Sequence, residues 1–226
     1  MIIEFSVSNY LSFCERQTLS MAASGTYREL PKNSFSTGVP KLPKLLRSSV
    51  IYGANASGKS NLVRGALFMW DFVLNSAKGQ EGDSIDVFPF LLSSRNGKEP
   101  SIFEMIFVED GIRYQYGFAA TRERDHHAWL IAYPKNRPQR WFERYYDPNT
   151  DKEVWTLHKK YMPGNREVWK DATRGNALFL STAIQLNSQP LRPVFDWFDK
   201  RLRVFRPHME ISQDYSATLC QNAEGR

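Results

Sequence analysis

The sequence predicts an α/β fold that carries an antiparallel β-sheet as an insert. The first observation behind this prediction is a short apolar run, residues 49–52, that leads into a glycine-containing loop and a helical pattern. The second is a series of Ile-, Val- and aromatic-rich runs, separated by turn signals, within residues 85–158. The third is the return of helical spacing from residue 176 onward. This mixed order gives the α/β class.

The N-terminal segment is expected to contribute strands. Residues 2–7 and 17–22 have the apolar and aromatic content of strands. Residues 24–47 are polar and basic and are punctuated by glycine and proline, which predicts a long connecting loop. Residues 49–52 then predict a buried strand that ends at Gly53.

Helical periodicity follows over residues 59–78, where apolar side chains recur three and four positions apart, at Leu62, Ala66, Met69, Trp70 and Val73. The next strands are predicted at residues 102–108, 112–120, 129–133 and 140–146. The Asp110-Gly111 pair is a strong hairpin signal, so these runs predict an antiparallel meander. Helices are expected again over residues 176–186 and 191–202.

Composition narrows the class of protein. The 226 residues are 42% hydrophobic and 24% charged, which excludes collagen-like, coiled-coil and disordered chains. No apolar stretch is long enough to span a bilayer, and the N-terminus lacks the features of a signal peptide. The two cysteines, Cys14 and Cys220, provide neither a disulfide framework nor a Cys-based zinc site. We therefore expect a cytoplasmic protein with no membrane partner. Its net charge of +6 permits a polyanionic partner such as nucleic acid without establishing one.

One motif carries the functional prediction. The run Gly53-Ala54-Asn55-Ala56-Ser57-Gly58-Lys59-Ser60 fits the P-loop pattern G-x-x-x-x-G-K-[ST] without a mismatch. Its glycines permit close backbone approach, so the N–H groups from Asn55 to Gly58 can surround a phosphate. Lys59 would supply a positive charge to the β- and γ-phosphates, and the Ser60 hydroxyl would ligate Mg²⁺. The predicted cofactors are ATP and Mg²⁺.

A family resemblance refines this prediction. Asn9-Tyr10-Leu11-Ser12-Phe13 and Gly58-Lys59-Ser60-Asn61-Leu62 resemble motifs of the ABC-type ATPases of the SMC, RecF and RecN group. Residues 15–22, 50–62, 103–118 and 176–187 look like the bacterial AAA family ATPases of the OLD-like, abortive-infection type, such as RloA and AbiL, which recur in anti-phage defence. The resemblance implies a P-loop NTPase fold of the ABC/SMC-head type, with Asn61 beside the nucleotide.

The sequence departs from that family at two places. Leu11 stands where related ATPases usually have a basic residue that helps to hold the nucleotide. No signature loop, Walker B strand or switch histidine follows Phe205. Residues 1–226 therefore resemble the N-terminal lobe alone, either as a fragment or because the second lobe is lost. Within that lobe we expect strands, P-loop and first helix at 1–80, the antiparallel insert at 85–158, a helical segment with the Q-loop at 170–206, and a tail at 207–226.

The resemblance also implies a glutamine that senses Mg²⁺ and the attacking water. Gln185 has the expected place after the insert, with Gln189 behind it, although a surface glutamine is an equal alternative. Met105 to Asp110 superficially resembles a Walker B strand, but the order Glu109-Asp110 and the following Gly111 indicate a hairpin tip. Asp71 and Asp86 are weaker candidates for a catalytic carboxylate.

Basic and aromatic residues interleave over residues 135–146, and residues 155–166 form a second basic stretch. Such runs can bind phosphates and stack bases, but a strand with a solvated basic face gives the same pattern. The His126-His127 pair lacks further ligands at metal spacing and is more typical of a polar loop.

The resulting expectation is an ATPase head, or its first lobe, from a bacterial anti-phage defence system. With a second lobe it would hydrolyse ATP, and two heads would dimerise around Mg-ATP to control an effector protein such as a nuclease or toxin. DNA or another nucleic acid remains open as a partner. Two alternatives remain open as well: a self-contained P-loop kinase or GTPase, and a truncated scaffold that binds nucleotide without turnover.

Overall fold

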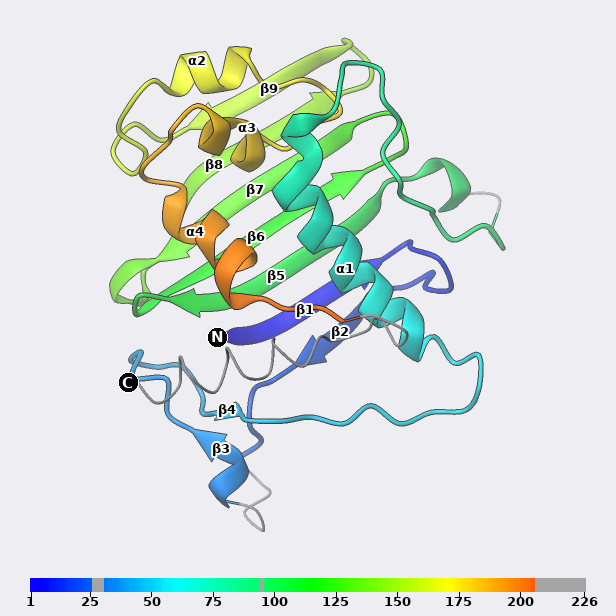
Figure 1. The fold of residues 1–226 in the computed structure, drawn as a ribbon, viewed down its shortest axis with the longest axis vertical. Helices are drawn as coiled ribbons and strands as arrows, with labels where there is room; N and C mark the ends of the chain where they lie inside the picture. Colours follow the sequence, from blue (N-terminus) through cyan, green and yellow to red (C-terminus); the bar gives the residue numbers. More distant parts are fainter. Residues whose placement is uncertain (26–30, 94–95, 206–226) are drawn as a thin grey trace, which may run out of the picture.

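The structure is a computed structural model that describes residues 1–25, 31–93 and 96–205. Its main feature is one seven-stranded sheet with the strand order β2-β1-β5-β6-β7-β8-β9 (Figure 1). The strands are β1 (Ile2–Ser8), β2 (Gln17–Ser20), β5 (Ser101–Glu109), β6 (Ile112–Ala120), β7 (Asp125–Tyr133), β8 (Gln139–Asp147) and β9 (Lys152–Leu157). Each neighbouring pair in this sheet is antiparallel.

The predicted antiparallel meander is therefore confirmed, but it is not a separate insert. Its first strand, β5, pairs with β1 from Ile2↔Phe107 to Ser8↔Ile102, so the N-terminal strands and the meander form one sheet. The Asp110-Gly111 turn has φ angles of 48° and 72°, the left-handed values that a tight hairpin requires. Strand β7 begins earlier than expected, and β9 extends the meander by a strand that the sequence pattern did not single out.

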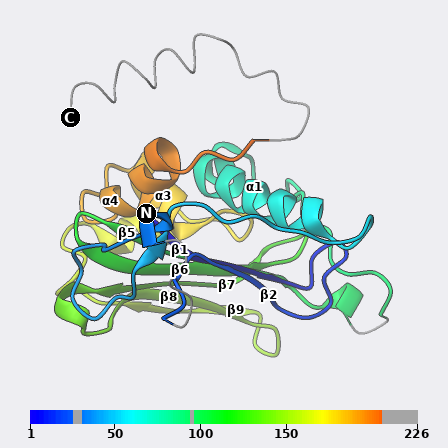
Figure 2. The same cartoon turned by 90° about the horizontal axis from the view of Figure 1, so that it is seen from below.

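The described helices lie on one face of this sheet (Figure 2). The longest is α1 (Lys59–Asn75), which continues into a 3-10 turn, Ser76–Lys78. The others are α2 (Arg166–Asp171), α3 (Phe179–Gln185) and α4 (Arg192–Asp196), followed by a π-helical turn, Trp197–Arg201. Among the described helices, none combines the length and apolar character that a bilayer span requires.

The core lies between the sheet and these helices. The apolar spacing of α1 places Met69 and Val73 against the sheet, as the periodicity predicts, and Phe72 is buried beside them. Phe107 of β5 stacks on Trp197 with ring centroids 4.0 Å apart, which fixes the π-helical turn to the sheet. Burial of each large side chain of this kind contributes about 1.5–3 kcal/mol to folding.

A small hairpin lies beyond the β2 edge of the sheet, at the bottom of Figure 1. It consists of β3 (Ser34–Phe35) and β4 (Leu45–Leu46), within the stretch that the sequence predicts to be a long loop. Leu45 is buried in a second core cluster with Ile3, Val39 and Val108. This cluster attaches the hairpin to β1 and β5.

The prediction of a buried strand at residues 49–52 is wrong. These residues form no strand, and the exposed fractions of Val50, Ile51 and Tyr52 are 69%, 42% and 86%. A P-loop strand is normally buried within a parallel sheet. Within the part of the chain that the structure describes, every strand pair is antiparallel and none includes residues 49–52, so this run has no ladder to join.

Candidate functional site

The P-loop connects this exposed segment to the N-terminus of α1. Gly58 is the N-cap of α1 and has φ 96°, and Ala56 also has a positive φ of 63°. The Lys59 ammonium donates to the carbonyl oxygens of Gly53 at 2.6 Å and Ala54 at 2.7 Å. Lys59 therefore folds back across the loop and holds its two ends together.

Both motif glycines lie in close contact with neighbouring side chains, and Gly58 also has a left-handed backbone conformation. A Cβ on Gly58 would lie 2.7 Å from Cε1 of Phe13, and a Cβ on Gly53 would lie 2.6 Å from the Ser57 hydroxyl oxygen. Contacts this short force neighbouring atoms to move, and the positive φ of Gly58 adds backbone strain for any other residue. The loop thus has the tight, glycine-dependent shape in which backbone N–H groups can surround an anion.

The N-terminal motif lies directly against the P-loop. Asn61 of α1 donates its side-chain amide to the Ser12 hydroxyl at 2.8 Å, and the Phe13 ring contacts the Gly58 backbone position. The Leu11 N–H donates to the Phe88 carbonyl oxygen at 2.9 Å. Two sequence motifs that are far apart along the chain therefore form one structural unit, in which Ser12 and Phe13 act as direct supports of the P-loop.

A groove with a volume of about 1360 Å³ runs from the P-loop along α1. Lys59 and Ser60 line it at the N-terminal end of the helix, and Asn75 and Ser76 line it at the other end. Tyr10, Leu11, residues 83–86 and Phe88 also line it. Three carboxylates line the groove: Asp71 and Asp86, which the sequence indicates only weakly, and Asp83, which the sequence reasoning missed.

Glu109 and Asp110 form a hairpin tip, as expected, and lie far from the P-loop. The other end of β5 is next to the N-terminal motif, since the Ser101 hydroxyl donates to the Asn9 carbonyl oxygen. Glu109 is eight positions after Ser101 along the strand, which corresponds to about 26 Å. Glu109 instead pairs with Arg201 at 3.2 Å. This geometry excludes a Walker B role for Glu109 and Asp110 within the described structure.

The structure does not bring Gln185 to the P-loop. Gln185 ends α3 and lines a small cavity of about 280 Å³ together with Leu74, Asn75 and Lys78, at the C-terminal end of α1. Ser60 is at the N-terminal end of the same helix, and fifteen helical residues span about 22 Å. Gln189, the second candidate, is exposed and donates to the Asn187 carbonyl oxygen at 3.4 Å.

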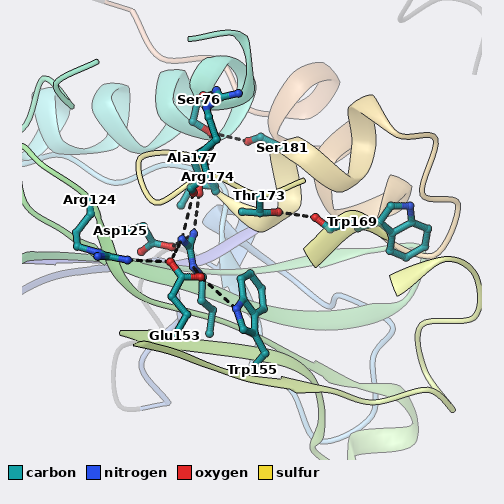
Figure 3. A network of polar contacts seen from close by, with 12 residues as sticks. Ser76, Arg124, Asp125, Glu153, Trp155, Trp169, Thr173, Arg174, Ala177 and Ser181 are labelled. Atoms are coloured by element: carbon teal, nitrogen blue, oxygen red, sulfur yellow. Dashed lines mark hydrogen bonds and ion pairs between the residues drawn. The ribbon is translucent and has the colours of Figure 1, made fainter. Parts of the chain in front are cut away.

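The basic and aromatic run at residues 135–146 divides between the two faces of β8. Arg144 is fully buried, whereas Arg140 is exposed and pairs with Glu143. The Arg144 guanidinium donates to Glu153, to Asp125 and to the carbonyl oxygens of Arg174 and Ala177. Figure 3 shows Asp125, Glu153 and Ala177 gathered around this network. Arg144 is therefore a structural residue and not part of a nucleic-acid surface.

The histidine pair is part of the sheet. His126 contacts the Thr121 hydroxyl at 3.0 Å, and His127 contacts the Glu143 carboxylate at 3.0 Å. Burial and the nearby Arg124 lower the pKa of His126. Over the described ranges, no group of His, Cys, Asp and Glu has the arrangement of a metal site. The Cys14 Sγ lies 3.9 Å from a carboxylate oxygen of Glu15, and Cys220 and the predicted tail lie outside the described residues.

Comparison with known proteins gives one family. The family model described as "AAA domain, putative AbiEii toxin, Type IV TA system" matches residues 48–160, which begin just before the P-loop and include α1 and the meander through β9. No curated protein matches the chain. Because the matched residues make up half of the sequence and contain the glycine-dependent P-loop described above, the chain belongs to this family of AAA domains with an α/β, P-loop-like fold.

Proposed function

We propose that this protein binds Mg-ATP at the P-loop and, once a second lobe completes the site, hydrolyses it. The observation that carries the proposal is the loop itself: the positive φ of Gly58 and the backfolded Lys59 at the N-terminus of α1. AAA domains use such loops to bind nucleotide with Mg²⁺. The residues of this loop fit a bound phosphate, because Gly53 and Gly58 have no Cβ atom and their backbone can approach it closely.

Each P-loop residue has a proposed role. The N–H groups of Asn55 to Gly58 surround the β-phosphate, and Lys59 exchanges the Gly53 and Ala54 carbonyl oxygens for phosphate oxygens. Ser60 provides the hydroxyl that ligates Mg²⁺, and Mg²⁺ neutralises charge on the β- and γ-phosphates. Asn61 keeps the N-terminal motif in contact with the loop through Ser12. Gln185 would have to approach from the far end of α1 to contribute, so we assign it no role within this chain alone.

The catalytic carboxylate is proposed to come from a second lobe or a second copy of the head. Two observations support this step. Glu109 and Asp110 are at the wrong end of β5, and the apolar residues Val50 to Tyr52 are exposed beside the P-loop and pair with none of the described strands. A parallel strand that ends in a carboxylate next to Ser60 would both bury this segment and supply the acid.

The biological role proposed here is the ATPase subunit of a bacterial anti-phage defence system of the abortive-infection kind. The family description, which names AbiEii and type IV toxin–antitoxin systems, supports this context. In the proposed mechanism, two heads engage around Mg-ATP, and this engaged state controls an effector such as a nuclease or toxin. ATP can drive the change only if it binds the engaged state more tightly than the separate heads.

The first test is equilibrium binding of Mg-ATP to the 226-residue chain, to Lys59→Ala and to Lys78→Ala. Lys78 is a matched control because it is an exposed cation at the other end of α1, bonded to the Asn75 side chain at 2.7 Å. We expect Lys59→Ala to weaken binding at least about 10-fold and Lys78→Ala to leave it unchanged, because only Lys59 reaches the phosphates. Equal binding by all three proteins would refute the P-loop proposal.

A turnover assay separates the remaining functions. No hydrolysis by the chain alone, followed by Lys59-dependent hydrolysis when a second lobe is supplied, supports the divided site. Lys59-dependent hydrolysis by the chain alone would instead support a self-contained P-loop enzyme, with Asp86 and Asp71 of the groove as the first carboxylates to replace. Nucleotide binding without turnover in either case would identify a scaffold.

A further inference from the structure

A second surface of the molecule has an unusual distribution of charge. No Asp or Glu occurs in the sequence between Glu29 and Asp71, and none occurs between Asp125 and Glu143. The exposed cations that these two stretches place on the β3–β4 hairpin and the β7–β8 turn are Lys32, Lys41, Lys44, Arg47, Lys135 and Arg137. We call this set the basic surface.

A side-chain contact holds the β3–β4 hairpin beside the β7–β8 turn, and these are the two parts of the basic surface. The Asn136 side chain, in the β7–β8 turn, donates to the Pro40 carbonyl oxygen in the hairpin. Lys135 precedes Asn136 and Lys41 follows Pro40, so cations from distant parts of the sequence become neighbours. At the other end of the hairpin, the Arg47 Nε donates to the Lys32 carbonyl oxygen at 3.1 Å.

The hairpin is anchored and not a free loop. Lys44 accepts a backbone hydrogen bond from Ala23 at 2.8 Å, and Leu46 donates one to Met21 at 2.7 Å. Buried Leu45 packs beneath them in the second core cluster. The cations are therefore presented from a fixed backbone, which lowers the entropy lost when they bind a rigid partner.

The cations of the basic surface have no carboxylate partner among residues 1–25, 31–93 and 96–205. Over the described residues, none of the six cations forms an ion pair with a carboxylate. Outside these six side chains, the sequence contains as many carboxylates as Lys and Arg side chains. The net charge of the chain, +6, therefore equals the number of cations on the basic surface. A surface with this charge favours a polyanion as its partner.

We propose that the basic surface binds the phosphate backbone of duplex DNA without sequence preference. Lysine and arginine side chains that neutralise phosphates release counterions, and this release provides the affinity. Single-stranded nucleic acid is usually held by exposed aromatic rings on which bases stack. The aromatic ring in this hairpin, Phe35, packs against the second core cluster and lies 5.3 Å from the Arg47 guanidinium, so it is not free to stack on bases.

The test is fluorescence anisotropy with a labelled 30-base-pair duplex DNA of mixed sequence, without nucleotide, over a series of salt concentrations. The variant that removes half of the basic surface is Lys41→Gln/Lys44→Gln/Lys135→Gln. Its matched control is Lys152→Gln/Lys159→Gln/Lys160→Gln, which removes three exposed lysines on and after β9. The two variants have the same net charge, so they separate a local surface from a general charge effect.

We expect the basic-surface variant to lose at least about 10-fold in affinity at ~100 mM salt and its salt dependence to weaken by about 3 in the slope of log K against log salt. The control variant should stay within about 2-fold of the original protein. Circular dichroism and urea unfolding establish that both variants are folded. If the triple variant is unfolded, the single change Arg137→Gln in the exposed turn replaces it, with an expected loss of about one unit of slope.

Three results would overturn the proposal. The first is no measurable binding of duplex DNA by the original protein at ~50 mM salt, where non-specific binding is strongest. The second is an equal loss of affinity in the two triple variants, which would show a net-charge effect. The third is tighter binding of single-stranded DNA or duplex RNA than of duplex DNA, which would assign the surface to another partner.

Discussion

The Arg144 Nη1 donates a hydrogen bond to the Ala177 carbonyl oxygen at 2.8 Å, and this contact joins the centre of strand β8 to the segment that leads into α3. Arg174, three residues earlier, contacts the carbonyl oxygens of Ser76 and Ala77 at the end of α1. The sheet, α3 and the C-terminal end of α1 are therefore connected through one short segment (Figure 3).

Replacing Arg144 with Met should lower the free energy of unfolding by about 3–5 kcal/mol. Asp125 and Arg144 are both fully buried, so the substitution removes the hydrogen bonds that Arg144 donates to the Asp125 carboxyl and to two backbone carbonyls. Urea unfolding measures this loss. The control is Arg140→Met on the same strand, whose exposed pair with Glu143 is worth less than about 1 kcal/mol. Similar stability of the two variants would contradict the structural role of Arg144.

The same network makes stability depend on pH. Burial raises the pKa of Asp125 from 3.8 to about 7, against the opposing effect of Arg144. Because the folded pKa lies above the unfolded one, the stabilising contribution of the protonated carboxyl is complete below pH 3.8 and is lost as the pH rises toward 7.

The measurement is urea unfolding of the original protein and of Asp125→Asn at pH 5 and pH 8. Relative to Asp125→Asn, which cannot ionise, the original protein should lose about 2–3 kcal/mol between these pH values, from about 1.4 kcal/mol per pH unit. A difference between the two proteins that does not change with pH would show that Asp125 stays ionised beside Arg144.

Gly58 at the N-cap of α1 and Gly65 within the helix should respond in opposite ways to alanine. At Gly58, a Cβ would collide with Phe13 and the φ of 96° would be strained, so Gly58→Ala should lower both stability and ATP affinity. At Gly65, a Cβ would lie 3.5 Å from Phe5 and Val7, which is ordinary contact, so Gly65→Ala should stabilise the helix by about 0.5–1 kcal/mol. Thermal unfolding and ATP titration test both changes, and a stable Gly58→Ala that binds ATP normally would contradict the loop geometry.

Local patterns in the sequence predicted much of the fold. The meander follows from short apolar runs and the Asp110-Gly111 turn, and α1 follows from its apolar spacing, because these signals depend on near neighbours. The P-loop was likewise predictable, since its motif is a local run of sequence in which Gly58 has the left-handed conformation that favours glycine.

Features that depend on contacts between residues distant in the sequence were not predicted correctly. Arg144 has the pattern of an exposed basic residue, and only the approach of Asp125, Glu153 and Ala177 makes its burial favourable. Gln185 was assigned by its order in the chain, whereas α3 lies against the far end of α1. Residues 49–52 have the composition of a buried strand, but a strand requires a neighbour, and none of the described strands pairs with them.

That exposed run provides the last prediction. Because Val50 and Tyr52 are 69% and 86% exposed, Val50→Asp and Tyr52→Asp should each change the free energy of unfolding of this chain by less than about 0.5 kcal/mol. Val73→Asp in the core is the contrasting control, with an expected loss of several kcal/mol because it buries an unpaired charge. If a second lobe is then supplied, the two exposed-site variants should weaken its association, because they place a charge where a partner strand must pack. A large loss of stability in Val50→Asp within the isolated chain would mean that residues 49–52 are buried in solution, and the proposed site for the second lobe would be wrong.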